Sequence, residues 1–152
     1  MRLKPQTYAL TAICHERRRI FQRTVNAELL VQTLLRYRDQ ERFLLHGFVV
    51  MPNHLHVLIT PAESIEKAAQ LIKGGFSFAV RKQHTGEVWQ EGYFAHRVTD
   101  ALDYEAQLGY IAHNPTRKRY ADYPYVHTAG AWVMDEPPDN SFPSEARPSP
   151  GG

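Results

Sequence analysis

The stretch His46–Ile59, HGFVVMPNHLHVLI, is the feature that most restricts how this chain folds. It contains two apolar runs separated by Pro52-Asn53, a dipeptide that is typical of a tight turn. The pattern predicts a β-hairpin with one strand over Phe43–Met51 and the return strand over His54–Thr60. We therefore expect the rest of the chain to be organised around this hairpin.

Side chains alternate between the two faces of a strand, so the return strand has two unlike faces. One face carries His54 and His56, and the other carries an apolar stripe of Leu55, Val57 and Ile59. Two neighbouring imidazoles on one face can bind one metal ion. The alternative is a pair of half-exposed histidines on a sheet, and their spacing alone does not decide between the two.

The hydrophobic pattern elsewhere predicts an α+β fold. Strands are expected over Thr7–Ile13, Phe43–Met51, His54–Thr60 and 89–98, and helices are expected to begin at Thr24, Ser64 and Asp100. The first six elements match a ferredoxin-like, RRM-like antiparallel sheet with both helices on one face. An added C-terminal helix is then free to pack on the open face, which carries the two histidines.

Three local signals give sharper expectations for these helices. Thr24 is expected to cap the first helix. Gly74-Gly75 is expected to interrupt the second helix, either as a kink or as its end. Asn114-Pro115 is expected to end the third helix, because the residue before a proline avoids the α region.

The third helix carries Tyr110 and Asn114, which lie four residues apart and therefore on the same helix face. With His54 and His56, Asn114 could complete a three-ligand site whose open positions let a divalent ion hold water or a phosphate. On helical spacing alone, the favoured interpretation of Tyr110 is an aromatic that packs on the sheet. Taken alone, Asn114 is likewise better explained as a polar residue at a helix end, before a proline.

The formal charge is only +2, but the basic residues are clustered. Any one cluster is typical of a solvated face, whereas several in one small domain support the hypothesis of a phosphate-binding surface. The candidate DNA contacts are Arg17, Arg18, Arg19, Lys73, Arg97, Arg117, Lys118 and Arg119. Trp89, Tyr93 and Phe94 either stack on unpaired bases or pack in the core.

Composition limits the class of protein. The 152 residues fit a single domain over 1–132, followed by a Pro/Ser/Gly-rich tail over 133–152 that we expect to be disordered. The one cysteine, Cys14, excludes a disulfide framework and a thiolate metal cluster. No apolar run approaches the ~20 residues of a membrane span, so a cytoplasmic protein without a membrane partner is expected.

Three segments together carry a family resemblance: MPNHLHVLI, VWQEGYFAHRVTD and YIAHNPTRK. The chain resembles the single-tyrosine transposases of insertion-sequence-200 type, and among them the REP-associated tyrosine transposases of bacteria. The likeness spans about Thr7 to Pro124. The N-terminal strand of this chain lacks the glycine-aromatic start that many REP-associated members have.

The resemblance implies a role for four residues. His54 and His56 match the paired metal-binding histidines, Tyr110 matches the nucleophile, and Asn114 matches the polar residue one turn later. Members of the family use Mg²⁺ or Mn²⁺ to cut single-stranded DNA beside a hairpin, and they become linked to the new 5′ phosphate. By this likeness the protein is a monomer or homodimer associated with the bacterial nucleoid.

Two other functions fit parts of the pattern. A non-catalytic nucleic-acid-binding module would use the basic surface without needing Tyr110. A metal-dependent phosphohydrolase would use His54 and His56 to activate water, and it would form no covalent link to DNA.

Overall fold

The computed structural model describes residues 5–117, 126–127 and 134–138. Its antiparallel sheet has the strand order β4-β1-β3-β2-β5. The strands are β1 (Thr7–Ile13), β2 (Phe43–Met51), β3 (His54–Pro61), β4 (Phe94–Val98) and β5 (Val126–His127). The helices are α1 (Thr24–Asp39), α2 (Ile65–Ala79) and α3 (Ala101–Arg117), with 3-10 turns η1 (His15–Arg17) and η2 (Ile20–Gln22). The predicted α+β class and the predicted hairpin are confirmed.

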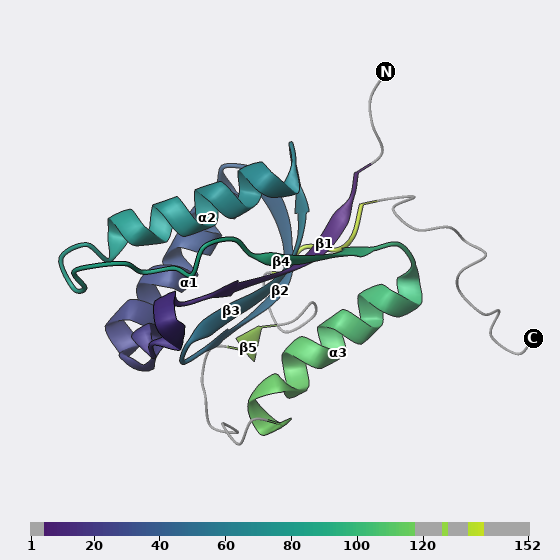
Figure 1. Ribbon diagram of the computed structural model, residues 1–152. Helices are drawn as coiled ribbons and strands as arrows, with labels where there is room; N and C mark the ends of the chain where they lie inside the picture. Colours follow the sequence, from purple (N-terminus) through teal and green to yellow (C-terminus); the bar gives the residue numbers. More distant parts are fainter. Residues whose placement is uncertain (1–4, 118–125, 128–133, 139–152) are drawn as a thin grey trace, which may run out of the picture.

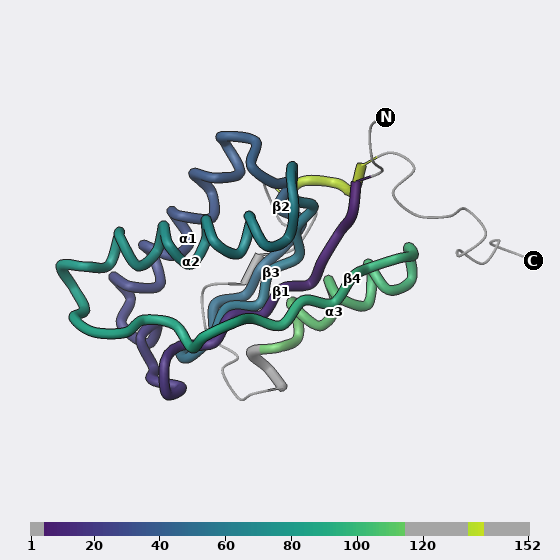
Figure 2. Tube along the Cα trace, turned by 45° about the horizontal axis from the view of Figure 1, so that its top comes forward, coloured from purple at the N-terminus to yellow at the C-terminus, as the bar shows by residue number. Residues whose placement is uncertain are grey.

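The sheet separates two packed layers, with α1 and α2 on one face and α3 on the other (Figure 1, Figure 2). Leu55, Val57 and Ile59 are fully buried in the cluster that α1 and α2 cover. Leu58 lies in a second cluster with Ile111 of α3. The alternation along β3 therefore sends its apolar stripe to the larger core, and α3 packs on the face predicted to carry the histidines.

The second helix corrects one expectation, because α2 runs without a break through Gly74 and Gly75. A Cβ atom added at Gly75 would lie 2.6 Å from Tyr37 Oη of α1, whereas one added at Gly74 would meet nothing within 4 Å. Gly75 therefore permits the close approach of α1 and α2 and does not end the helix.

The predicted cap of the first helix is also wrong. α1 begins at Thr24 itself, with Arg23 as its N-cap residue and no side-chain capping bond. The other two predicted caps are present: Ser64 Oγ accepts the Lys67 N–H at 3.1 Å, and Asp100 Oδ1 accepts the Asp103 N–H at 2.8 Å.

The end of α3 also differs from expectation, because the helix continues through Pro115 to Arg117. Ile111 and Asn114 are both 0% exposed. Burial of this helix face outweighs the preference of a residue before proline for extended backbone. No helix in the described part of the chain is long and apolar enough to cross a membrane.

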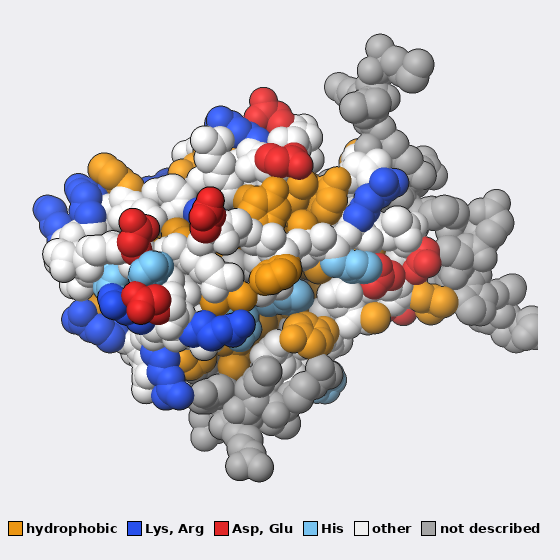
Figure 3. Space-filling view, viewed as in Figure 1, with side chains coloured by type: hydrophobic (Ala, Val, Ile, Leu, Met, Phe, Trp, Pro, Cys, Tyr) orange, Lys and Arg blue, Asp and Glu red, His pale blue; other side chains and the backbone are white. Residues whose placement is uncertain are grey.

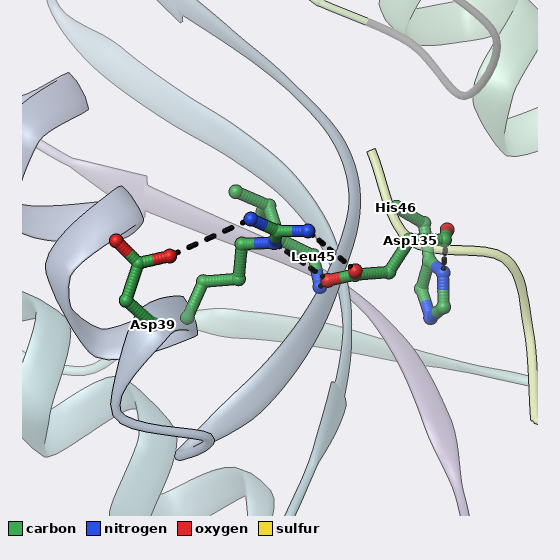
Figure 4. Close-up of polar contacts among 5 residues, drawn as sticks. Asp39, Leu45, His46 and Asp135 are labelled. Carbon is green, nitrogen blue, oxygen red and sulfur yellow. Dashed lines mark hydrogen bonds and ion pairs between the residues drawn. The ribbon is translucent and has the colours of Figure 1, made fainter. Parts of the chain in front are cut away.

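Residues 134–138, which fall within the predicted tail, lie beside the first half of β2. Leu45 N–H donates to Asp135 Oδ2 at 2.8 Å, and Asp135 N–H donates to the Leu45 carbonyl at 2.8 Å. Arg38 donates to both carboxylate oxygens of Asp135, at 3.0 and 2.9 Å (Figure 4). The rest of the predicted tail lies outside the described residues.

Candidate active site

The two histidines of β3 lie on the face that α3 covers. Their register is fixed by both neighbouring strands: His54 pairs with Ile13 and Met51, and His56 pairs with Thr11 and Val49. His54 is half-buried, whereas His56 is only 8% exposed. The two histidines therefore lie on the same face of β3, as the alternation of side chains along the strand predicts.

The helix α3 brings Tyr110 to His56. The two rings lie 5.0 Å apart between centroids, at an interplanar angle of 60°. Earlier in the helix, Tyr104 packs on His46, whose Nε2 lies 2.7 Å from Thr60 Oγ1 near the far end of β3. The helix therefore runs from the Thr60 end of the strand towards its His54 end.

Asn114 follows Tyr110 by one helical turn on the same face. Four helical residues advance about 6 Å, which is close to the about 6.6 Å between alternate residues of a strand. The direction of α3 thus places Asn114 towards the His54 end of β3. Asn114 is fully buried, yet neither Oδ1 nor Nδ2 has a hydrogen-bond partner among the described residues.

Each imidazole has an oxygen beside its Nδ1 atom. Thr11 Oγ1 lies 2.8 Å from His56 Nδ1, and Asn53 Oδ1 lies 2.8 Å from His54 Nδ1. Burial, and to a lesser extent the nearby His54, lower the pKa of His56 to about 4, although Gln107 opposes the shift. At neutral pH the His56 ring is therefore uncharged, the form that binds metal ions.

Polar atoms without partners are rare in protein interiors, so their position here is informative. His56 Nε2 is buried and, like the amide of Asn114, has no hydrogen-bond partner in the described part of the chain. Two imidazole nitrogens and one amide oxygen form a donor set suited to a divalent ion. No group of three or more His, Cys, Asp or Glu residues among those described could hold a metal, so Asn114 is the third candidate ligand.

The basic run Arg17–Arg19 lies at the same end of the sheet as His54. Flanking residues attach this segment to the hairpin turn, since Cys14 N–H donates to Asn53 O at 2.9 Å and Phe21 N–H donates to Pro52 O at 3.0 Å. All three arginines are exposed. Figure 3 shows Lys and Arg side chains gathered at this end of the molecule.

Lys73 and Arg97, two further candidate cations, are not brought to the histidines. Lys73 Nζ donates to the carbonyls of Gln90 and Gly92, at 3.1 and 2.8 Å, and holds the loop before β4. Arg97 pairs with Tyr8, which packs against the α1 and α2 core, so Arg97 lies on the opposite face of the sheet from His56. The Arg117 side chain, Lys118 and Arg119 fall outside the described residues.

The three aromatic candidates separate by burial. Trp89 is 8% exposed and packs in the core, and Tyr93 is half-buried against it. Phe94 is 63% exposed on β4 and pairs with Thr11, the residue opposite His56. Phe94 therefore shares a row and a sheet face with His56. Figure 3 shows hydrophobic and histidine side chains at the surface between β4 and α3.

Sequence reasoning missed Thr11 and Asn53 beside the histidines. Asn53 directly precedes His54, so its position in the turn was a usable signal. Thr11 becomes visible only through the pairing of β1 with β3, which places it opposite His56. Gln107 lies one turn before Ile111 on α3, and no sequence spacing distinguished it.

The fold and this site define a class: an antiparallel sheet with a histidine pair covered by a helix that bears a tyrosine. Residues 3–114 match the family described as Transposase IS200 like, and the chain belongs to this family.

Two relatives and one solved structure illustrate the likeness. A REP-associated tyrosine transposase of Escherichia coli K12 is 24% identical over 109 residues, covering 67% of this chain and 64% of that protein. An uncharacterized protein of Haemophilus influenzae is 25% identical over 142 residues, covering 71% and 79%. The solved structure of a REP-associated tyrosine transposase bound to a REP hairpin shares the fold, with TM-score 0.70, 22% identity, and coverage of 83% of this chain and 78% of that one.

Proposed function

We propose that this transposase cuts single-stranded DNA beside a hairpin in a metal-dependent reaction, and rejoins strands through a 5′-phosphotyrosine intermediate. The observation that carries the proposal is the packing of the Tyr110 ring on the ring of His56, at 5.0 Å between centroids. His56 Nε2 is buried without a hydrogen-bond partner among the residues that the structure describes, and a tyrosine that only packed on the sheet would not explain this.

Tyr110 acts as the nucleophile. Its Oη forms a bond to phosphorus while the bond from phosphorus to the 3′ oxygen breaks, so the phenol loses a proton and the departing 3′ oxygen gains one. The DNA 5′ phosphate stays on the protein. Because the phosphotyrosine ester replaces the broken ester, a free 3′ hydroxyl can reverse the step, which favours strand transfer over hydrolysis.

His54, His56 and Asn114 would hold Mg²⁺ or Mn²⁺. A divalent ion in this place supplies charge stabilisation at a non-bridging phosphate oxygen. The fold contributes an uncharged His56 ring, since burial keeps its pKa far below neutral pH. It also contributes a rigid frame, because both histidines lie in a strand that is paired on both sides.

The DNA partner is proposed from charge and from the solved relative, which is bound to a REP hairpin. The exposed run Arg17–Arg19 is available to a phosphate backbone at the His54 end of the sheet. Arg117, Lys118 and Arg119 follow Asn114 in sequence and are proposed to bind phosphates near the reaction. Phe94 is proposed to stack on an unpaired base.

The test is a denaturing gel of labelled single-stranded hairpin DNA, incubated with protein and Mn²⁺. We expect a protein–DNA adduct with wild type, and none with Tyr110→Phe or with a His54→Ala, His56→Ala double variant. Tyr104→Phe is the matched control, because it makes the same change on the same helix, six residues away. It should retain the adduct.

Other outcomes would favour the alternatives. Cleavage without an adduct that survives Tyr110→Phe would indicate a phosphohydrolase. DNA that is bound but neither cut nor linked would indicate a binding module. Sedimentation of the DNA complex distinguishes a monomer from a homodimer.

A further inference from the structure

We infer that Thr11 and Asn53 are positioning residues that hold His56 and His54 in the tautomer with hydrogen on Nδ1, so that both Nε2 atoms present a lone pair to the metal. This inference rests on the proposed function, because it concerns the same metal site. Both residues act through the histidines.

Asn53 determines the tautomer of His54 by the chemistry of its oxygen. Its Oδ1 lies 2.8 Å from His54 Nδ1. An amide oxygen only accepts hydrogen bonds, so Nδ1 carries the hydrogen and Nε2 carries the lone pair. Asn53 is itself held in place, because its backbone carbonyl accepts the Cys14 N–H at 2.9 Å.

Thr11 has the same relation to His56 from the neighbouring strand. Its Oγ1 lies 2.8 Å from His56 Nδ1, and the β1–β3 register places the two residues directly opposite each other. A hydroxyl can accept the Nδ1–H. The opposite nitrogen, Nε2, is buried without a hydrogen-bond partner within the described part of the chain, as expected of an atom kept for a ligand.

The repetition of one arrangement on two adjacent histidines is what makes the inference specific. An oxygen that accepts a hydrogen bond from the ring nitrogen not bound to the metal fixes both the tautomer and the ring orientation of a metal-binding histidine. Loss of such a partner typically costs about ten- to a hundredfold in metal affinity. Neither oxygen belongs to a charged group, so each positions its ring without adding net charge to the site.

The first measurement is the tautomer of each ring in the metal-free protein, from long-range ¹⁵N–¹H NMR correlations. We expect the Nδ1–H form for both His54 and His56, and a redistribution at His56 alone in Thr11→Val. The second measurement is Mn²⁺ affinity by calorimetry. Thr11→Val and Asn53→Ala should each weaken binding about ten- to a hundredfold.

Matched variants separate positioning from folding. Thr7→Val alters a second threonine on the same face of β1. Thr7 is buried and its Oγ1 lies 2.7 Å from Thr60 Oγ1, and the variant should keep wild-type affinity. Thr11→Ser and Asn53→Asp retain an accepting oxygen, and each should bind Mn²⁺ at least as tightly as wild type. Asn53 has no positive φ, so alanine fits its backbone.

An Nε2–H form of either ring in wild type would overturn the inference, whatever the variants do. It is also overturned if Thr11→Val and Asn53→Ala bind Mn²⁺ as wild type does, or if Thr7→Val loses as much affinity. If wild type forms the DNA adduct while Thr11→Val and Asn53→Ala bind Mn²⁺ as wild type does, only the inference about positioning is rejected and the proposed function is retained. Expected tautomers and affinities with no DNA adduct would reject the proposed function alone.

Discussion

At the scale of single residues, exposure separates Phe94 from the other two aromatic candidates, Trp89 and Tyr93. Stacking of one base on an aromatic ring contributes about 1–3 kcal/mol, so Phe94→Ala should weaken single-stranded DNA binding about 5- to 150-fold. Phe78 on α2 is the matched control, since it is 65% exposed against 63% for Phe94. Fluorescence anisotropy with a hairpin carrying an unpaired flank measures both; equal losses would argue against a stacking role.

Cys14 gives a second prediction at this scale. The side chain is 0% exposed, and burial raises the pKa of its thiol to about 12. Because the thiolate is the reactive form, a colorimetric thiol reagent at pH 8 should not react with the native protein. Reaction should appear only in urea at concentrations that unfold the chain. Rapid modification of the native protein would contradict the packing described for the end of β1.

The positions of site side chains could be predicted where the period of a single strand or helix determines them. Alternation placed His54 and His56 on one face, and the four-residue spacing placed Tyr110 and Asn114 on one side of a helix. Lys73 shows the limit of this reasoning. Its charge resembled a DNA contact, but the carbonyls that it binds come from the loop at Gln90 and Gly92, which no local pattern brings to α2.

At the scale of elements, the glycine pair of α2 offers a matched comparison. Gly74→Ala should stabilise the protein by about 0.5–1 kcal/mol, because alanine favours helix and its Cβ meets open space. Gly75→Ala should gain less or lose stability, since its Cβ would meet Tyr37 Oη at 2.6 Å. Urea unfolding measures both changes.

The coupling can be checked directly. In a Tyr37→Leu background, Gly75→Ala should become as favourable as Gly74→Ala, because the obstructing ring and its hydroxyl have gone. If the two alanine variants are equally stable with Tyr37 present, the contact between α1 and α2 is not as close as described.

The segment at 134–138 predicts an acid dependence of stability. Arg38 and the Leu45 N–H hold the Asp135 carboxylate, and their hydrogen bonds bring its pKa below the ordinary value of 3.8 despite burial. The stabilisation is therefore full above pH 3.8 and is lost as the pH falls through the folded-state pKa. Asp135→Asn should cost about 1–3 kcal/mol at pH 7.

Thermal unfolding at a series of pH values tests this. The difference in stability between wild type and Asp135→Asn should shrink below pH 4. A difference that stays constant down to pH 3 would mean that the carboxylate charge contributes nothing.

Elements were predictable where composition and turn chemistry agree. The strand Phe43–Met51 has the predicted bounds, and Ser64 and Asp100 cap the helices assigned to them. The errors fall where contacts between elements decide. Gly75 lies against a neighbouring helix, and α3 passes Pro115 because its preceding turn is buried against the sheet.

At the scale of the whole molecule, the proposed metal site and the exposed arginine run are separate features at one end of the sheet. EDTA should therefore abolish adduct formation while leaving hairpin binding within about twofold. Raising NaCl should weaken hairpin binding steeply, because phosphate contacts release counterions. Anisotropy titrations with and without EDTA measure this, and loss of hairpin binding in EDTA would show that the ion also builds the DNA surface.

The overall plan followed from the order of elements, since a strand-helix-strand-strand-helix-strand succession allows few antiparallel arrangements. The site could be predicted only as far as one element carries it. Which residue of β1 faces His56, and which part of α3 lies over it, depend on register and helix direction, and neither is encoded in a local period.

Tyr110 and Asn114 occupy successive turns of one rigid helix, so they cannot leave the sheet independently. Under the proposed function, docking of α3 and occupation of the metal site become thermodynamically linked, and each must favour the other by the same factor. Withdrawal of the phenol from the phosphate would then also weaken the hold on the ion. Docking of α3 would bring the nucleophile and the metal ligand to the site together, and undocking of α3 would remove both.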